Sequence, residues 1–92
     1  MTAPDLVPLR DDIERVDRAI IQLVAERVRL ARDIGAVKRA AGVPTLDHGR
    51  EAAVVRRAVE LAREAGLQYD EEIRQIFWQL IGLSRRAQTH DG

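Results

Sequence analysis

The stretch LVAERVRLARDIGAVKRA, residues 23–40, decides the fold, because its apolar side chains recur at helical spacing. At about 100° per residue they fall on one stripe of an α-helix, with charged side chains opposite. The stripe continues in both directions and predicts one amphipathic helix of roughly 50 Å from Leu9 to Ala41. Pro8 suits the first turn of this helix, and Gly42 followed by Pro44 is a stop signal.

Two shorter amphipathic helices are expected to follow. Asp47 can cap the second helix, whose apolar face continues until Gly66 ends it. Asp70 can cap the third helix, which contains Gly82 at a cost of roughly 1 kcal/mol relative to alanine. Since nothing repeats and no segment is of low complexity, residues 1–92 are interpreted as a single all-α domain of three helices, one long and two shorter.

The long helix exceeds the ~30 Å diameter of a small domain, so one compact monomer cannot cover its apolar stripe. A chain of 92 residues also buries only roughly 60 to 65 % of its unfolded surface. An exposed stripe of that length would promote aggregation. We therefore predict a homodimer in which two long helices pack together and the short helices close over them.

Composition excludes several functional classes. The 15 basic and 15 acidic residues balance, so the chain lacks the net charge expected of a nucleic-acid or membrane-surface binder. The basic pairs Arg56–Arg57 and Arg85–Arg86 are attributed to solvated helix faces. The absence of cysteine excludes disulfides, and two histidines are too few for a His/Cys zinc site. No signal-peptide pattern or run near the ~20 apolar residues of a membrane span is present, so we expect a cytoplasmic protein.

Five polar side chains interrupt the apolar faces. Arg27 and Lys38 are eleven residues apart and lie on one line near the centre of the long stripe. Ser84 and Gln88 are one turn apart on the apolar face of the third helix, and Glu51 projects from the first turn of the second. Each alone has an ordinary structural explanation as a snorkelling cation, a satisfied core group or a first-turn carboxylate. Together they predict a polar cavity for a small anion that carries a hydroxyl group.

Arg10 lies at the border of the stripe, seventeen residues and about 25 Å along the helix from Arg27. That separation is too large for both arginines of one chain to hold the same small ligand. In an antiparallel dimer, the start of one long helix lies alongside the middle of the other, so Arg10 can complete the site of the partner chain. The alternative is an exposed arginine in the first turn.

Three motifs occur in order along the chain: LRDDIERVDRAIIQLVAERVRLARDIGAVK, the D-x-x-R-E segment from Asp47 to Glu51, and FWQLIGLSRRAQ. From about Leu9 to Gln88, this ordered set resembles the all-helical, AroQ-type chorismate mutases. The resemblance implies an intertwined helical homodimer with two equivalent sites. It also implies the Claisen rearrangement of chorismate to prephenate, on the way to phenylalanine and tyrosine.

The resemblance implies a role for each residue of the candidate site. Arg27 and the partner subunit's Arg10 look like clamps for the two substrate carboxylates, since the arginine fork binds carboxylate bidentately. Ser84 would assist carboxylate binding, and Lys38 and Gln88 would meet the ether oxygen.

Three residues of the second helix's first turn complete this assignment. Glu51 and the backbone at Asp47 would meet the ring hydroxyl. Arg50 has a supporting role because it points to the border of its helix's apolar face. His48 is expected to be an exposed residue without chemistry.

A pericyclic rearrangement needs no nucleophile, general base, metal or cofactor, and none is expected here. It needs a folded substrate and stabilisation of the negative charge that builds on the ether oxygen. Lys38 is therefore the residue expected to be most costly to lose, followed by Gln88, since one such donor contributes roughly 3 to 4 kcal/mol. The amide of Gln88 predicts activity that is nearly flat from about pH 6 to 8.

Other functions remain open from the sequence. An isochorismate-pyruvate lyase uses a similar cationic pocket, but the Arg50–Glu51 pair favours a ring substituted at position 4. A 4-amino-4-deoxychorismate mutase is harder to separate, because Glu51 can also accept from an ammonium. A non-catalytic helical dimerisation module predicts apolar residues at positions 27, 38, 84 and 88, which the sequence does not have.

Overall fold

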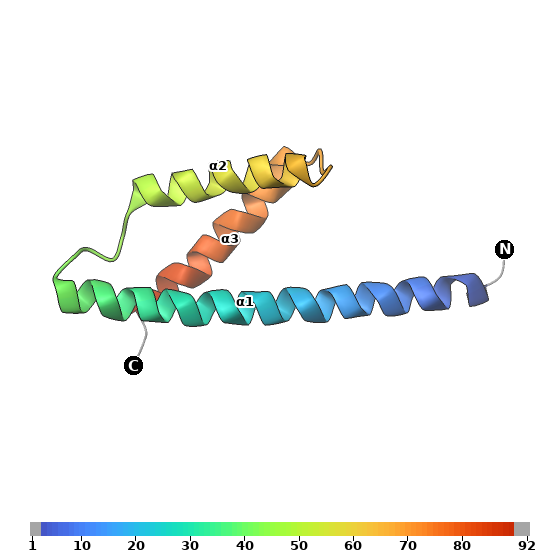
Figure 1. The fold of residues 1–92 in the computed structure, drawn as a ribbon, viewed down its shortest axis with the longest axis horizontal. Coiled ribbons are helices and arrows are strands. Elements are labelled where there is room, and N and C mark those ends of the chain that lie inside the picture. The colour runs from blue at the N-terminus through green and yellow to red at the C-terminus, as the bar shows by residue number, and fades with distance from the viewer. Residues whose placement is uncertain (1–2, 90–92) are drawn as a thin grey trace.

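The computed structural model describes residues 3–89, which form a short 3-10 helix and three α-helices. The 3-10 helix η1 spans Ala3–Leu6 and leads directly into α1, Val7–Ala41. Helices α2, His48–Glu64, and α3, Asp70–Thr89, follow after two short connections (Figure 1). The all-α prediction of one long and two shorter helices is confirmed for the described part of the chain.

Local signals fix the ends of α1 and α2 as expected. Pro8 lies in the first turn of α1, and Gly42 ends it in the left-handed conformation, with φ 68°. The backbone N–H of Gly42 donates to the carbonyl of Arg39, closing the last turn. At the start of α2, the Asp47 side chain accepts from the backbone N–H of Arg50 at 3.0 Å, so Asp47 is the predicted cap.

The start of α3 differs from the prediction. Asp70 is the first residue of α3 rather than the residue before it, and the backbone N–H of Ile73 bonds to the carbonyl of Tyr69. The Asp70 carboxylate instead accepts two hydrogen bonds from the Arg63 guanidinium on α2. A cross-helix ion pair has taken the place of the cap, and it ties α3 to α2 across the turn.

The three helices do not pack equally on one another. Helix α3 packs against both α1 and α2, whereas within residues 3–89 no Cα atom of α1 lies within 8 Å of a Cα atom of α2. The buried apolar side chains are mostly small and gather along these two contacts: Ala31, Val55, Ala58, Val59, Ala62, Ile81 and Ala87. The core therefore depends on α3 as the element that joins the other two.

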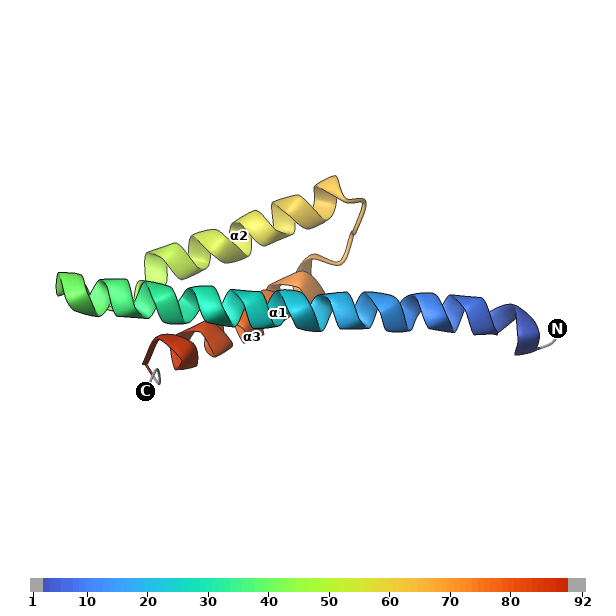
Figure 2. The same ribbon diagram turned by 60° about the horizontal axis from the view of Figure 1, so that its bottom comes forward.

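The N-terminal half of α1 extends away from α2 and α3 (Figure 1), as the rotated view also shows (Figure 2). Its apolar stripe has no cover within the described chain: Leu9, Ile13, Ile20 and Leu23 are each more than half exposed. The molecule measures 61 × 29 × 16 Å, so one dimension is far longer than a compact domain of this size requires. The predicted mismatch between the length of α1 and the size of the core is present in the structure.

Gly35 is a site of close approach between α1 and α3. A Cβ atom at this position would lie 2.7 Å from the backbone oxygen and 2.8 Å from the Cα of Gln88. Both neighbours are backbone atoms, so no side-chain rotation can relieve the overlap. The sequence pattern did not single out this residue, although a glycine inside an apolar stripe is a signal of close helix packing.

Substituting the two interior glycines should have opposite effects. Gly35→Ala should lower the free energy of unfolding by about 1–2 kcal/mol, because overpacking exceeds the helix propensity gained. Gly82→Ala meets nothing within 4 Å in the chain and should raise stability by about 0.5–1 kcal/mol. Urea unfolding at equal protein concentrations measures both, and equal effects of the two substitutions would contradict the packing at Gly35.

Candidate active site

A cavity of about 400 Å³ lies between the C-terminal half of α1, the start of α2 and the end of α3. Its polar lining consists of nine residues: Arg27, Lys38, Thr45, Asp47, Arg50, Glu51, Ser84, Arg85 and Gln88. Every predicted site residue except Arg10 is among them. The polar side chains that interrupt the apolar faces of three separate helices thus lie around one cavity.

The charge of the lining favours an anion. Four cationic side chains and two carboxylates line the cavity, which leaves a net charge of two positive. Arg27, Lys38 and Glu51 are all half-buried, and no charged side chain is fully buried among residues 5–89. Reduced contact with water strengthens the attraction between these groups and a bound anion.

Arg27 is fixed in the cavity by α3. Its Nη1 atom donates to the Ser84 hydroxyl oxygen at 2.5 Å and lies 3.4 Å from the backbone oxygen of Leu80. Both contacts use one end of the guanidinium fork, so its other N–H groups can still bind a carboxylate. Ser84 therefore orients the arginine in addition to facing the cavity.

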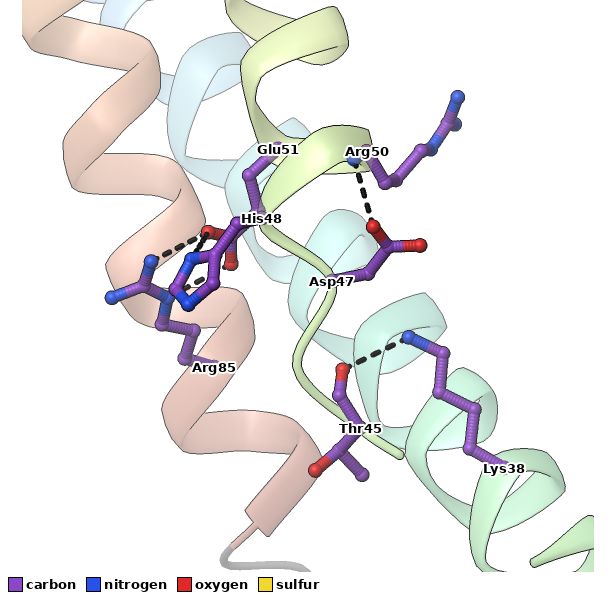
Figure 3. A network of polar contacts seen from close by, with 7 residues as sticks. All are labelled: Lys38, Thr45, Asp47, His48, Arg50, Glu51 and Arg85. Atoms are coloured by element: carbon purple, nitrogen blue, oxygen red, sulfur yellow. Dashed lines mark hydrogen bonds and ion pairs between the residues drawn. The ribbon is translucent and has the colours of Figure 1, made fainter. Parts of the chain in front are cut away.

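Lys38 reaches across the connection between α1 and α2. Its Nζ donates to the backbone oxygen of Thr45 at 2.9 Å (Figure 3). An ammonium has three donors, so this contact leaves two for a ligand. The bond to Thr45 fixes the direction of the side chain, which otherwise has four rotatable bonds.

Glu51 forms a two-bond pair with Arg85 on α3 (Figure 3). Arg85 Nε donates to Oε2 at 2.8 Å, and Nη2 donates to Oε1 at 2.5 Å. The hydrogen bonds from Arg85 hold the pKa of Glu51 below its ordinary value, against the opposing effect of burial. The Glu51 side chain is 14 % exposed and the Arg85 side chain 45 %, so the carboxylate is the better shielded partner.

Arg85 is exposed, in keeping with its attribution to a solvated face, but it has a second role that the sequence analysis missed. It also lines the cavity and pairs with Glu51. Its position one turn before Gln88 on α3 was the available signal, since residues three apart are neighbours on a helix. The partner itself could not be found from the sequence, because it depends on how α2 and α3 cross.

Gln88 contributes to the site through its amide and to the fold through its backbone. The backbone oxygen of Gln88 accepts a hydrogen bond from Arg39 Nη1, and its Cα lies close to Gly35. Its side chain faces the cavity and makes no hydrogen bond within residues 3–89. The backbone contacts therefore hold Gln88 against α1, and the N–H groups of its side-chain amide can bind a ligand.

The first turn of α2 contributes backbone as well as side chains. The Asp47 side chain caps α2 through Oδ1, and its backbone oxygen accepts from the N–H of Glu51 at 3.1 Å, so a ligand would meet its backbone N–H or Oδ2. Arg50 lines the cavity, but its guanidinium points away from the pair of Glu51 and Arg85 (Figure 3). His48 is exposed as expected, with its Nδ1 3.6 Å from Glu51 Oε1.

Arg10 is exposed on the N-terminal part of α1 and does not line the cavity of its own chain. This agrees with the separation calculated from the sequence.

The helices and the cavity define a class: a small all-helical protein with a half-buried cavity whose lining carries net positive charge. The chain belongs to the chorismate mutase type II family, whose model matches residues 9–89. No described helix has the length and apolar character needed to cross a membrane.

Individual relatives agree with this assignment. A chorismate mutase of Methanocaldococcus jannaschii is 33% identical over 76 residues, 83% of this chain and 75% of the relative. The intracellular chorismate mutase of Mycobacterium bovis is 38% identical over 58 residues, 63% of this chain and 55% of the relative. The T-protein of Enterobacter agglomerans is 35% identical over 66 residues, 72% of this chain but only 18% of that longer protein. The predicted family and enzyme class are confirmed.

Proposed function

We propose that this chain is a chorismate mutase that converts chorismate to prephenate in a homodimer with two equivalent sites. The observation that carries the proposal is the cavity itself, in which the predicted polar residues of three helices surround a space with a net charge of two positive. Chorismate is a dianion with a ring hydroxyl and an ether oxygen, and the lining offers a group for each. A cytoplasmic location and a place in aromatic amino-acid synthesis accompany this proposal.

Arg27 binds one substrate carboxylate. The bond to Ser84 fixes its guanidinium before the substrate arrives, so less side-chain freedom is lost on binding. The second carboxylate is bound by the partner subunit's Arg10. Holding both carboxylates folds the side chain of the substrate over its ring, which brings the bond-forming carbons together.

Lys38 and Gln88 bind the ether oxygen. As the C–O bond lengthens, negative charge grows on this oxygen, and donors already in place stabilise it without reorganising. Because the charge is greater in the transition state than in the bound substrate, these contacts raise the rate of the chemical step. Glu51 and the backbone at Asp47 position the ring through its hydroxyl group.

The homodimer is supported by the uncovered stripe of α1. Leu9, Ile13, Ile20 and Leu23 present apolar surface that a second α1 can cover. Arg10 follows Leu9 directly, so the same contact places a cation near the partner's cavity. A non-catalytic dimerisation module would also have the apolar stripe, but it does not account for the charged side chains that line the cavity.

Two alternative activities use the same scaffold and are tested by the same assay. An isochorismate-pyruvate lyase would release pyruvate from isochorismate, and a 4-amino-4-deoxychorismate mutase would prefer the amino substrate. Chromatography of the products from all three substrates separates these activities, and turnover of chorismate to anything other than prephenate contradicts the proposal.

Lys38→Ala should reduce kcat at least about a hundredfold, because one preorganised donor to the developing charge is removed. The rate is followed as loss of chorismate absorbance, with prephenate identified by chromatography. Arg29→Ala is the matched control, since Arg29 is an exposed cation of α1 outside the cavity. Equal losses in both variants would remove Lys38 from its assigned role.

Gln88→Glu should make activity depend on pH. The amide donates at every ordinary pH, so the wild-type rate should be nearly flat from about pH 6 to 8. A carboxylic acid donates only when protonated, so the rate of the variant should fall as the pH rises. A wild-type rate that collapses near neutrality would contradict the role of Gln88.

Arg10→Ala and Lys38→Ala should complement one another when the two chains are mixed, unfolded and refolded together. If Arg10 acts in the partner's site, a mixed dimer has one intact site, and an equal mixture recovers about one quarter of the wild-type rate. If Arg10 acts in its own chain, every site remains defective. Each variant refolded alone is the control, and absence of recovery in mixed dimers overturns the shared site.

A further inference from the structure

The pair of Glu51 and Arg85 carries an inference that rests on the proposed function. We propose that Arg85 is a specificity-determining residue, which makes the site select a substrate with a neutral ring hydroxyl over one with a ring ammonium. The geometry behind this proposal is the fork of Arg85, which contacts both oxygens of the only glutamate that lines the described cavity.

The pair still leaves room for a ligand. An ionised carboxylate has about four acceptor positions, and a bidentate arginine uses two of them. Glu51 can therefore accept a hydrogen bond from a ring hydroxyl while it remains paired with Arg85. The pair also fixes the Glu51 side chain, which reaches the cavity from the first turn of α2.

The pair changes the charge that a ring substituent meets. An unpaired glutamate would attract an ammonium, whereas a glutamate neutralised by Arg85 gains little from it. The other charged groups of the lining are the cations Arg27 and Lys38 on α1 and Arg50 on α2, and Asp47, whose Oδ1 caps α2. His48 lies outside the lining, with its Nδ1 3.6 Å from Glu51 Oε1. An ammonium beside Glu51 would therefore meet four cationic side chains and two carboxylates, one of which is already paired with Arg85.

Arg85 also changes the pH at which Glu51 takes up a proton. Because the hydrogen bonds from Arg85 lower the pKa of Glu51, the carboxylate stays ionised further into acid. Removing Arg85 should raise that pKa, so the loss of activity on acidification should begin at a higher pH. A residue with a merely structural role would not move this limb of the pH profile.

The experiment compares chorismate with its 4-amino analogue at pH 6.5, where the amine is protonated. The wild type should have the higher kcat/KM for chorismate. Arg85→Gln removes the charge and should shift the ratio of the two kcat/KM values toward the amine by about tenfold or more. Arg85→Lys keeps the charge and should retain the wild-type preference. Arg86→Gln is the matched control, because Arg86 is the neighbouring exposed cation and does not line the cavity.

The outcomes separate this inference from the function on which it rests. If wild type turns over neither substrate, both proposals fail. If it converts chorismate but Arg85→Gln loses activity equally on both substrates, only the role of Arg85 is overturned. A wild type that does not discriminate between the two substrates overturns it as well, even if Arg85→Gln does not fold.

Discussion

The close contact between α1 and α3 at Gly35 and Gln88 is the constraint on which the rest of the structure depends. The backbones of α1 and α2 do not approach each other closely within the described chain, so the position of α2 relative to α1 is set through α3. The same contact brings Ser84 to Arg27 and holds the amide of Gln88 at the cavity. A glycine in α1, where any side chain would push α3 away, thus determines the shape of a site to which it contributes no functional group.

The site relies on charges that are oriented before any ligand binds. Ser84 holds Arg27, Thr45 holds Lys38, and Arg85 holds Glu51, each through a bond no longer than 2.9 Å. For a reaction that proceeds within one molecule, such fixed charges and a fixed shape are the contributions a protein can make. The site therefore uses few charged groups, and its activity depends on how accurately they are positioned.

Helical periodicity was sufficient to predict the three helices, most of their end signals and the residues that share the cavity. It succeeded because polar residues at apolar positions are informative wherever the stripe itself is clear, as at Arg27 and Lys38. It failed where the answer depends on how helices cross. Asp70 pairs with Arg63 rather than capping α3, and Arg85 pairs with Glu51 rather than only with water. Neither partner is encoded in the spacing along one helix.

The separation between the backbones of α1 and α2 has a mechanical consequence. Lys38 on α1 and Glu51 on α2 face one cavity from elements that are joined directly only by a short connection and indirectly by α3. A molecule that bonds both side chains at once supplies the missing tie between the two helices. The ligand then links α1 to α2 in addition to reacting. We therefore expect the three helices to be held most rigidly while the cavity is filled.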